Sequence, residues 1–429
     1  MEQVKHIRLQ DGVYLTTVHT AKFKSSRFGI KFLMPLDPEH ASEYALLPWV
    51  LRRGSQAHPD MACLSAALDE LYGGVIEPDV TKKGETQCIG FAASFLDDAY
   101  ALEGEALLEP ACRLLGELVL KPLVCEGVFS ADYVAGEREN LVDRIRATIN
   151  DKRQYSMLRL GQEMCRDEAY GVSRYGDEER ACAITPDSLW GAYRTLLERA
   201  WVEIYYCGSA EPERVEQAVR AAFAALPDTG CRISPACQVR ANAGREPRVI
   251  EQAMDVTQGK LAMGFRTGGV TAGSEDYPAL MVFNAVFGGT SMSKLFMNVR
   301  EKLSLCYFAS SMLEKHKGLM MVSSGIEFDK YDRARTEILA QLEACRRGDI
   351  TQEELEGAKR ILITALRTTL DSQNRLADFW LGQRIAGLDQ SPARLVELLE
   401  RVDMDRVVAA ARSVELDTVY FLKGKEEQA

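Results

Sequence analysis

Residues 288–311 read GGTSMSKLFMNVREKLSLCYFASS, and the local pattern of this stretch changes twice. Two glycines end an apolar run, a helical segment follows as far as Arg300, and an alternating run begins near Leu305. Alternation of apolar and polar residues predicts a β-strand. The stretch therefore predicts a helix joined to a strand, with Arg300 and Tyr307 on either side of the junction.

The same order of elements occurs in the first half of the chain. Residues 43–55 pass from an acidic start through an apolar segment to a glycine and a hydroxyl residue, and residues 276–290 do the same. Each half also ends in a predicted strand, at 201–208 and at 417–424. Because few residues are identical between the halves, the order of elements is what predicts an internal duplication.

A linker separates the two halves. Residues 227–247 contain three prolines, two glycines and little periodicity, which is typical of a connecting segment. We therefore predict an α+β fold of two similar domains, each a mostly antiparallel β-sheet packed with helices. The N-terminal domain is expected at 1–226, the linker at 227–247 and the C-terminal domain at 248–429.

Composition narrows the class of partner. The 429 residues carry a formal net charge of -11, which argues against a nucleic-acid partner, since phosphate binding needs a positive surface. The N-terminal residues lack the pattern of a signal peptide, and no apolar run is long enough to span a membrane. Eleven cysteines without a C-x-x-C pair indicate free thiols. We expect a cytoplasmic protein that binds neither membrane nor nucleic acid.

The stretch at 288–311 also resembles a known family. Taken with Phe265–Val270 before it and Glu353–Lys359 after it, it closely resembles the C-terminal domain of the pitrilysin/insulinase family of inverzincin peptidases, which includes the mitochondrial processing peptidases. Gly73-Gly74 and Tyr170-Gly171 also fit, so the resemblance covers nearly the whole chain. It is nearest to the YmfF-like group, which is associated with 5-aminopentanol modification of elongation factor P.

The resemblance implies a LuxS/inverzincin metallopeptidase-like fold, in which such domains close around a chamber that holds an unfolded peptide. Active members carry H-x-x-E-H on the first long helix, where two histidines bind zinc and the glutamate is the general base. A further glutamate on another helix completes the zinc site. The metal site is therefore the first feature to look for in this chain.

That metal motif is absent. When the helix is aligned by its basic-basic-glycine end, the five motif positions fall on Ala45, Leu46, Leu47, Pro48 and Trp49. None of the five histidines stands four residues from another. We therefore expect no catalytic residues, no metal ligands, no cofactor and no autonomous activity.

Two details near this helix stay open at the level of sequence. Close to the expected third ligand stand Glu137, Glu139 and Arg144, so a carboxylate could survive there, although alone it binds no zinc. Pro48 costs about 3 kcal/mol inside a helix, and this cost largely disappears only if Pro48 falls in the first turn.

Arg300 and Tyr307 fit a second motif of the family. The resemblance implies that such a pair reaches towards the zinc site of a facing domain and binds substrate. The arginine would bind a carbonyl or carboxylate, and the phenol would donate to a developing oxyanion. The alternative is a solvated charge at a helix end and a tyrosine in the core.

These features lead to three hypotheses. In the first, the chain is a pseudo-peptidase subunit that forms a heterodimer with a zinc-bearing homologue. It would form half of a peptide-binding chamber and contribute Arg300 and Tyr307 to substrate binding. This hypothesis includes a link to elongation factor P modification. In the second, it is a non-catalytic peptide-binding scaffold. In the third, it is an independent metallopeptidase with unrecognised ligands. Association with itself, as a homodimer, is open in each case.

Overall fold

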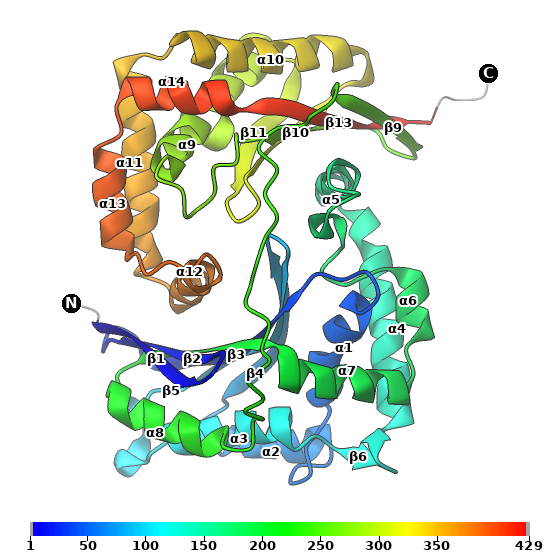
Figure 1. Cartoon of the computed structure of the whole chain (residues 1–429), viewed down its shortest axis with the longest axis vertical. Coiled ribbons are helices and arrows are strands. Elements are labelled where there is room, and N and C mark those ends of the chain that lie inside the picture. The colour runs from blue at the N-terminus through cyan, green and yellow to red at the C-terminus, as the bar shows by residue number, and fades with distance from the viewer. Residues whose placement is uncertain (1–2, 426–429) are drawn as a thin grey trace. The chain divides into compact units, whose positions relative to one another are not determined.

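The computed structural model describes residues 3–425, which divide into two compact units (Figure 1). The first unit combines residues 3–146, 172–236 and 373–381, and the second combines residues 147–171, 237–372 and 382–425. Each unit thus gathers segments that are distant in the sequence. The contiguous domains expected at 1–226 and 248–429 stay a prediction, because a sequence repeat and a compact unit are different divisions of a chain.

The sheet of the first unit has the strand order β1-β2-β8-β3-β5-β4. Neighbouring strands are antiparallel except for β2 and β8, which run parallel. The strands are β1 (Gln3–Gln10), β2 (Val13–His19), β3 (Ser25–Pro35), β4 (Val75–Lys83), β5 (Thr86–Leu96) and β8 (Trp201–Gly208). A two-stranded ribbon joins β6 (Val124–Cys125) to β7 (Val128–Phe129).

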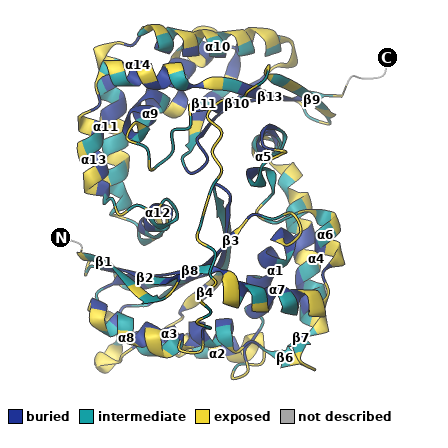
Figure 2. Cartoon of the chain, viewed as in Figure 1, coloured by how far each residue is buried: buried dark blue, intermediate teal, exposed yellow. Residues whose placement is uncertain are grey.

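Helices of the first unit bury their apolar residues against this sheet (Figure 2). On β3 the side chains of Phe28, Ile30 and Phe32 alternate into a core that also takes Leu46 and Leu115, as a strand with one covered face requires. The helices are α1 (Ala41–Leu51), α2 (Met61–Asp69), α3 (Leu108–Leu120), α4 (Ala131–Ala147), α6 (Glu178–Ala183), α7 (Pro186–Arg199) and α8 (Pro212–Ala222), with 3-10 turns η1 (Asp98–Tyr100) and η2 (Leu102–Gly104).

The sheet of the second unit has the strand order β11-β12-β10-β13-β9, and only β13 and β9 run parallel. The strands are β9 (Arg248–Met254), β10 (Gly259–Arg266), β11 (Cys306–Glu314), β12 (Leu319–Ile326) and β13 (Glu415–Gly424). Its helices are α5 (Lys152–Met164), α9 (Tyr277–Asn284), α10 (Tyr331–Arg347), α11 (Gln352–Thr369), α13 (Pro392–Glu400) and α14 (Met404–Ser413), with the π-helices η5 (Ala285–Gly289) and η6 (Leu295–Lys302) and the 3-10 turns η3 (Thr148–Asn150), η4 (Ala169–Gly171) and η7 (Phe328–Lys330).

The two sheets share one topology, which confirms the predicted duplication. In each sheet the last strand from that half of the chain pairs in parallel with an earlier strand: β8 pairs with β2, and β13 pairs with β9. The remaining strands then follow in the same order, β3-β5-β4 in one sheet and β10-β12-β11 in the other. The prediction of mostly antiparallel sheets packed with helices is confirmed as well.

The helix that aligns with the metal motif begins at Ala41, seven residues before Pro48. Pro48 therefore lies inside α1, and the condition that would remove its cost, a place in the first turn, is not met. Pro48 is buried, as are the neighbouring Ala45, Leu46 and Leu47. The helix thus keeps an interior proline, and the apolar surface that it buries stabilises it.

Segment 147–171, which contains α5, packs on the sheet of the second unit. Along β10, Leu261 and Met263 face one core, whereas Ala262 between them faces a second core with Leu160 and Met164 of α5. This alternation places α5 on the opposite face of the sheet from α9. The segment therefore belongs to the second unit although it stands in the first half of the sequence.

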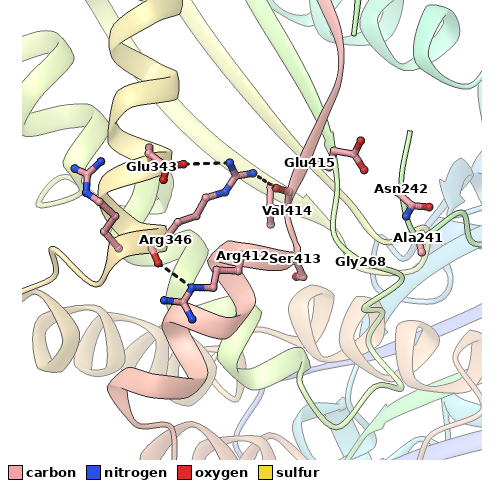
Figure 3. Close-up of a pocket in the computed structure, with 10 residues that line it drawn as sticks. Ala241, Asn242, Gly268, Glu343, Arg346, Arg412, Ser413, Val414 and Glu415 are labelled. Carbon is pink, nitrogen blue, oxygen red and sulfur yellow. Dashed lines mark hydrogen bonds and ion pairs between the residues drawn. The ribbon is translucent and has the colours of Figure 1, made fainter. Parts of the chain in front are cut away.

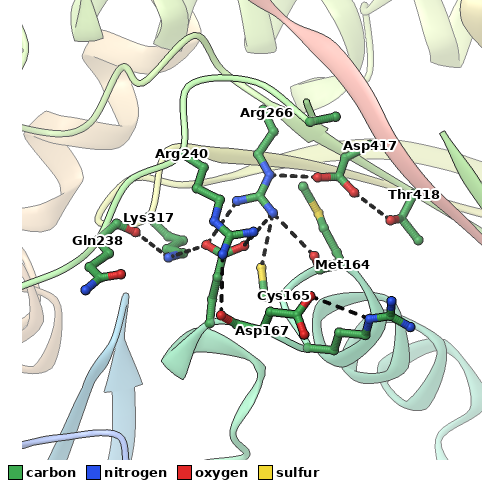
Figure 4. Close-up of polar contacts among 12 residues, drawn as sticks. Met164, Cys165, Asp167, Gln238, Arg240, Arg266, Lys317, Asp417 and Thr418 are labelled. Atoms are coloured by element: carbon green, nitrogen blue, oxygen red, sulfur yellow. Dashed lines mark hydrogen bonds and ion pairs between the residues drawn. The ribbon is translucent and has the colours of Figure 1, made fainter. Parts of the chain in front are cut away.

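A buried ionic network fixes the end of this segment (Figure 4). The Glu168 carboxylate accepts hydrogen bonds from Arg266 at 2.7 Å and lies 2.7 Å from the ammonium of Lys317. Arg266 also donates to Asp417 at 2.8 Å. These four side chains are at most 2% exposed, so each charge depends on its partners rather than on water.

Part of α12 (Gln373–Ile385) lies on the sheet of the first unit. The side chain of Gln373 donates hydrogen bonds to the backbone carbonyls of Ser25 and Cys207, and Lys83 lies 2.6 Å from Asp378.

Among residues 3–425, no helix has both the length and the apolar character that crossing a membrane requires.

Candidate functional site

A stacked pair includes Trp49, the residue that the sequence alignment matches to the second motif histidine. The guanidinium carbon of Arg144, on α4, lies 3.3 Å from the ring centroid of Trp49, on α1. At this distance the cation interacts directly with the π-face of the indole. A cation thus lies where a metal site would need neutral or negative ligands.

The carboxylate that the sequence left open is engaged elsewhere. Glu137 is 5% exposed, lies 2.5 Å from the guanidinium of Arg53, and accepts a hydrogen bond from Asn140 at 3.1 Å. Arg53 stands one turn beyond Trp49 and follows Arg52, the C-cap of α1. Glu137 therefore neutralises a cation, and α1 and α4 are joined by two guanidinium contacts.

No group of three potential metal ligands occurs within residues 3–425. The two histidines that flank α1 each lie near a single carboxylate: His40 is 3.0 Å from Glu43, and His58 is 3.6 Å from Glu117. The side chains present on α1 and α4 do not fit a zinc ion. The donor set lacks both motif histidines and places an arginine against Trp49.

The stacked pair makes a prediction about stability. In a double-mutant cycle of Trp49→Ala and Arg144→Ala, we expect a coupling free energy of about 1–2 kcal/mol, as for a partly desolvated cation–π pair. Denaturant unfolding of the four proteins measures it. The matched control pairs Trp49→Ala with Arg146→Ala, since Arg146 lies on the same helix but binds Glu178. Equal coupling in the two cycles would contradict direct stacking.

Arg300 and Tyr307 line one pocket of about 450 Å³ in the second unit. Arg300 lies on η6 and Tyr307 on β11, and the fold brings them to the same cavity from either side of the helix–strand junction. Their side chains are accessible: that of Arg300 is 42% exposed, and Tyr307 is 62% exposed. The alternative of a core tyrosine is therefore wrong.

Three uncommon backbone features meet at this pocket. Arg300 lies on a π-helix of eight residues, a form that is rare and often found at functional sites. Ser304 has φ +49° although it is not glycine, which is a strained conformation. Tyr307 is the extra residue of a β-bulge, because Cys306 pairs with Ile326 and Phe308 with Gly325. Bulges redirect side chains, and here the bulged tyrosine is exposed and lines the pocket.

The pocket contains more charges than the sequence motif indicates. Glu301 lies 3.4 Å from the Nε of Arg300, and Lys330 lies 2.7 Å from Glu327. All four line the cavity with Tyr307. The hydrogen bond to Glu327 raises the pKa of Lys330, and the negative charge of the same carboxylate acts in the same direction. Lys330 is therefore charged at neutral pH. The sequence analysis did not identify Lys330 and Glu327, because they follow β12 in the chain and lie outside the motif that contains Arg300 and Tyr307.

A second pocket, of about 870 Å³, lies at the ends of α10 and α14 (Figure 3). Arg346 donates to the backbone carbonyls of Ala411 and Val414 and lies 3.3 Å from Glu343. Arg412 donates to the carbonyl of Arg346. These arginines bind the last carbonyls of two helices, a common arrangement at helix ends. The pocket with Arg300 and Tyr307 is the stronger candidate, since the guanidinium of Arg300 makes no hydrogen bond to a backbone carbonyl of the described residues.

Comparison with known proteins finds relatives over the whole chain. Residues 183–362 match the family description "Peptidase M16 inactive domain". "Probable inactive metalloprotease YmfF" of Bacillus subtilis (strain 168) is 37% identical over 415 residues, covering 97% of this chain and 96% of the relative. "Uncharacterized zinc protease YmxG" of the same strain is 27% identical over 163 residues, covering 37% of this chain and 39% of the relative.

A solved structure agrees with these matches. The structure titled "Crystal structure of a conserved protein from Enterococcus faecalis V583" superposes with a TM-score of 0.88 at 27% identity, covering 99% of this chain and 100% of that chain. The duplicated α+β architecture described above is thus shared along the full length of a known protein.

Proposed function

The chain belongs to the M16 peptidases, the pitrilysin/insulinase family expected from its sequence, and we propose that it is a catalytically inactive subunit of that family. In this proposal it pairs with a zinc-bearing homologue, forms half of a peptide-binding chamber, and contributes Arg300 and Tyr307 to substrate binding. One observation carries the proposal: Arg144 stacks on Trp49, the residue that aligns with the second motif histidine, whereas Arg300 and Tyr307 share an accessible pocket.

The retained pair suits peptide binding. A guanidinium offers several N–H donors in a fixed plane, and a phenol offers one O–H donor. Both groups therefore match the carbonyl and carboxylate oxygens of an extended peptide. In this proposal neither group acts as a nucleophile or as a zinc ligand, so the chemistry would come from the partner and the positioning from this chain.

The names of two relatives support a division of labour. One relative is called an inactive metalloprotease and the other a zinc protease, and both come from the same strain. We propose that this chain corresponds to the inactive type and that its partner is of the zinc type. The link to elongation factor P modification and the cytoplasmic location expected from the sequence are part of the same proposal. They are tested by deleting the gene in its own organism and weighing elongation factor P by mass spectrometry.

Metal content is the first test. The purified chain is expected to contain far less than one zinc per chain by elemental analysis, and a chelator is expected to leave its melting temperature unchanged. A metal that stabilised the fold would shift the melting temperature when removed. One tightly held zinc per chain would support the independent metallopeptidase instead.

Mixing with a zinc-bearing homologue is the second test. We expect the rate of peptide cleavage by the homologue to rise when this chain is added, and to saturate at a fixed ratio of the two chains. If the homologue alone cleaves as fast as the mixture while the chains still associate, the scaffold hypothesis is favoured. A chain that associates only with itself would support the homodimer.

A further inference from the structure

Lys330 adds a second cation to the pocket of Arg300 and Tyr307. It stands at the end of η7, with its ammonium 2.7 Å from Glu327 and 3.4 Å from the backbone carbonyl of Ser304. Because Ser304 is the strained residue between Arg300 and Tyr307, this contact places the ammonium beside the helix–strand junction. The cavity therefore presents an ammonium, a guanidinium and a phenol together.

The guanidinium of Arg300 keeps its binding edge free. Its carbon lies 4.6 Å from the centroid of the Phe296 ring, so one face of the group rests on an aromatic ring. Its Nε lies 3.4 Å from Glu301. Within residues 3–425 the two terminal nitrogens make no hydrogen bond. Phe296 and Glu301 thus orient the group, while the two N–H edges that bind a carboxylate side by side stay available.

Building on the proposed function, we propose that this pocket binds a carboxylate of the peptide and that Lys330 is the residue that determines this specificity. The carboxylate would bind between Arg300 and Lys330 with the Tyr307 hydroxyl as a further donor. Glu327 is the internal competitor, since it holds Lys330 until the peptide carboxylate replaces it. The peptide carboxylate is either an acidic side chain or the free C-terminus.

The inventory of donors and acceptors favours an anion over a cation. Both glutamates of the pocket already lie beside a cation, so a lysine or arginine of a peptide would find each carboxylate engaged. A carboxylate, in contrast, finds the terminal nitrogens of Arg300. A neutral backbone carbonyl would need only Arg300 and Tyr307, and Lys330 would then have no effect on peptide choice.

The test is a binding assay with four matched peptides. One unfolded, fluorescently labelled peptide carries a central glutamate and the other a central glutamine, and each is made with a free or an amidated C-terminus. Fluorescence anisotropy with the full chain measures the dissociation constants. We expect a carboxylate-bearing peptide to bind roughly two- to fivefold more tightly than its neutral match, the range of one partly exposed charge pair. Comparison of the free and amidated peptides shows whether the pocket binds the glutamate side chain or the C-terminal carboxylate.

Variants locate the effect. Lys330→Gln is expected to lower the preference for the carboxylate, since only Arg300 then carries a positive charge in the pocket, and Glu327→Gln is expected to increase it severalfold by removing the competitor. Lys302→Gln is the matched control, because it changes the net charge equally on an exposed residue outside the pocket. Melting temperatures check that the surface variants fold.

The outcomes separate two claims. Equal binding of acidic and neutral peptides, both dependent on Arg300, would overturn the role of Lys330 but leave the proposed peptide-binding function intact. An equal loss of preference in Lys302→Gln and Lys330→Gln would also overturn it, because the effect would then follow net charge. Binding of no peptide at all would overturn this proposal and count against Arg300 and Tyr307 as substrate-binding residues as well.

Discussion

Replacement of Glu168 by glutamine is expected to lower the free energy of unfolding by about 3–5 kcal/mol, as when one partner of a buried ion pair is removed. Glu168 is the carboxylate shared by Arg266 and Lys317 inside the second unit, and all three side chains are at most 2% exposed. Glutamine keeps the shape but not the charge. The ammonium of Lys317 would then be buried opposite a neutral amide.

Denaturant unfolding measures this effect, and the chain offers a matched control. Glu163 lies on the same segment and pairs with Arg159 nearer the surface, with side chains 25% and 34% exposed. Glu163→Gln is expected to cost less than about 1 kcal/mol, as exposed pairs do. A second change, Lys317→Met, should restore part of the stability lost in Glu168→Gln. Equal effects of the two glutamate variants would show that the buried network contributes nothing special.

The same carboxylate predicts a pH dependence. Burial by itself would raise the pKa of Glu168, but hydrogen bonds from Arg266 and Lys317 outweigh burial and lower it. A folded-state pKa below the unfolded value of about 4.3 means that the unfolded chain binds more protons in that range. The contribution of Glu168 is therefore fully present above the unfolded pKa and is lost as the pH falls through the folded pKa. Between about pH 5 and pH 3 the free energy of unfolding, measured by denaturant, should depend less on pH for Glu168→Gln than for the wild type.

The duplicated fold was predictable because its signals are local. Alternation marks the strands, and glycines mark the turn after each apolar helix, so the order of elements repeats visibly in the sequence. Segment 147–171 was not predictable in this way. Its residue Glu168 looks like a surface acid in the sequence, and it becomes buried only because α5 packs on strands that begin about a hundred residues later, at Arg248.

The residues of the candidate site differ in the same way: some belong to a local motif, and others are brought in only by the fold. Arg300 and Tyr307 stand in one contiguous motif, and a resemblance of motifs finds them. Lys330 lines the pocket because β11 and β12 form a hairpin that brings the chain back to the junction of η6 and β11. The spacing of residues in the sequence does not predict this. The contact of Arg144 with Trp49 likewise depends on how α1 packs against α4, so the sequence could place Arg144 near the metal position but could not state what it touches.

Arg300→Ala, mixed with a zinc-bearing homologue, is expected to reduce the rate of peptide cleavage by about 10²–10³-fold if the arginine acts in the transition state, as loss of a preorganised donor does. Arg300 is accessible, and its guanidinium is oriented by Phe296 and Glu301, so it needs no rearrangement to bind substrate. Arg300→Lys should recover only part of the rate, because an ammonium lacks the planar pair of donors. Tyr307→Phe is expected to have a smaller effect, since it removes one donor.

The decisive comparison is between cleavage and assembly. Arg300 lines a pocket in the second unit, and its guanidinium lies against Phe296 and Glu301 of its own helix, so its replacement should leave association with the homologue unchanged while cleavage falls. Lys302→Ala, on the same helix but outside the pocket, should change neither quantity. A mixture that keeps its full rate with Arg300→Ala would reject the substrate-binding role and leave the scaffold hypothesis. A rate that falls only because the chains no longer associate would show that the arginine serves the interface, since addition of excess variant would then restore cleavage.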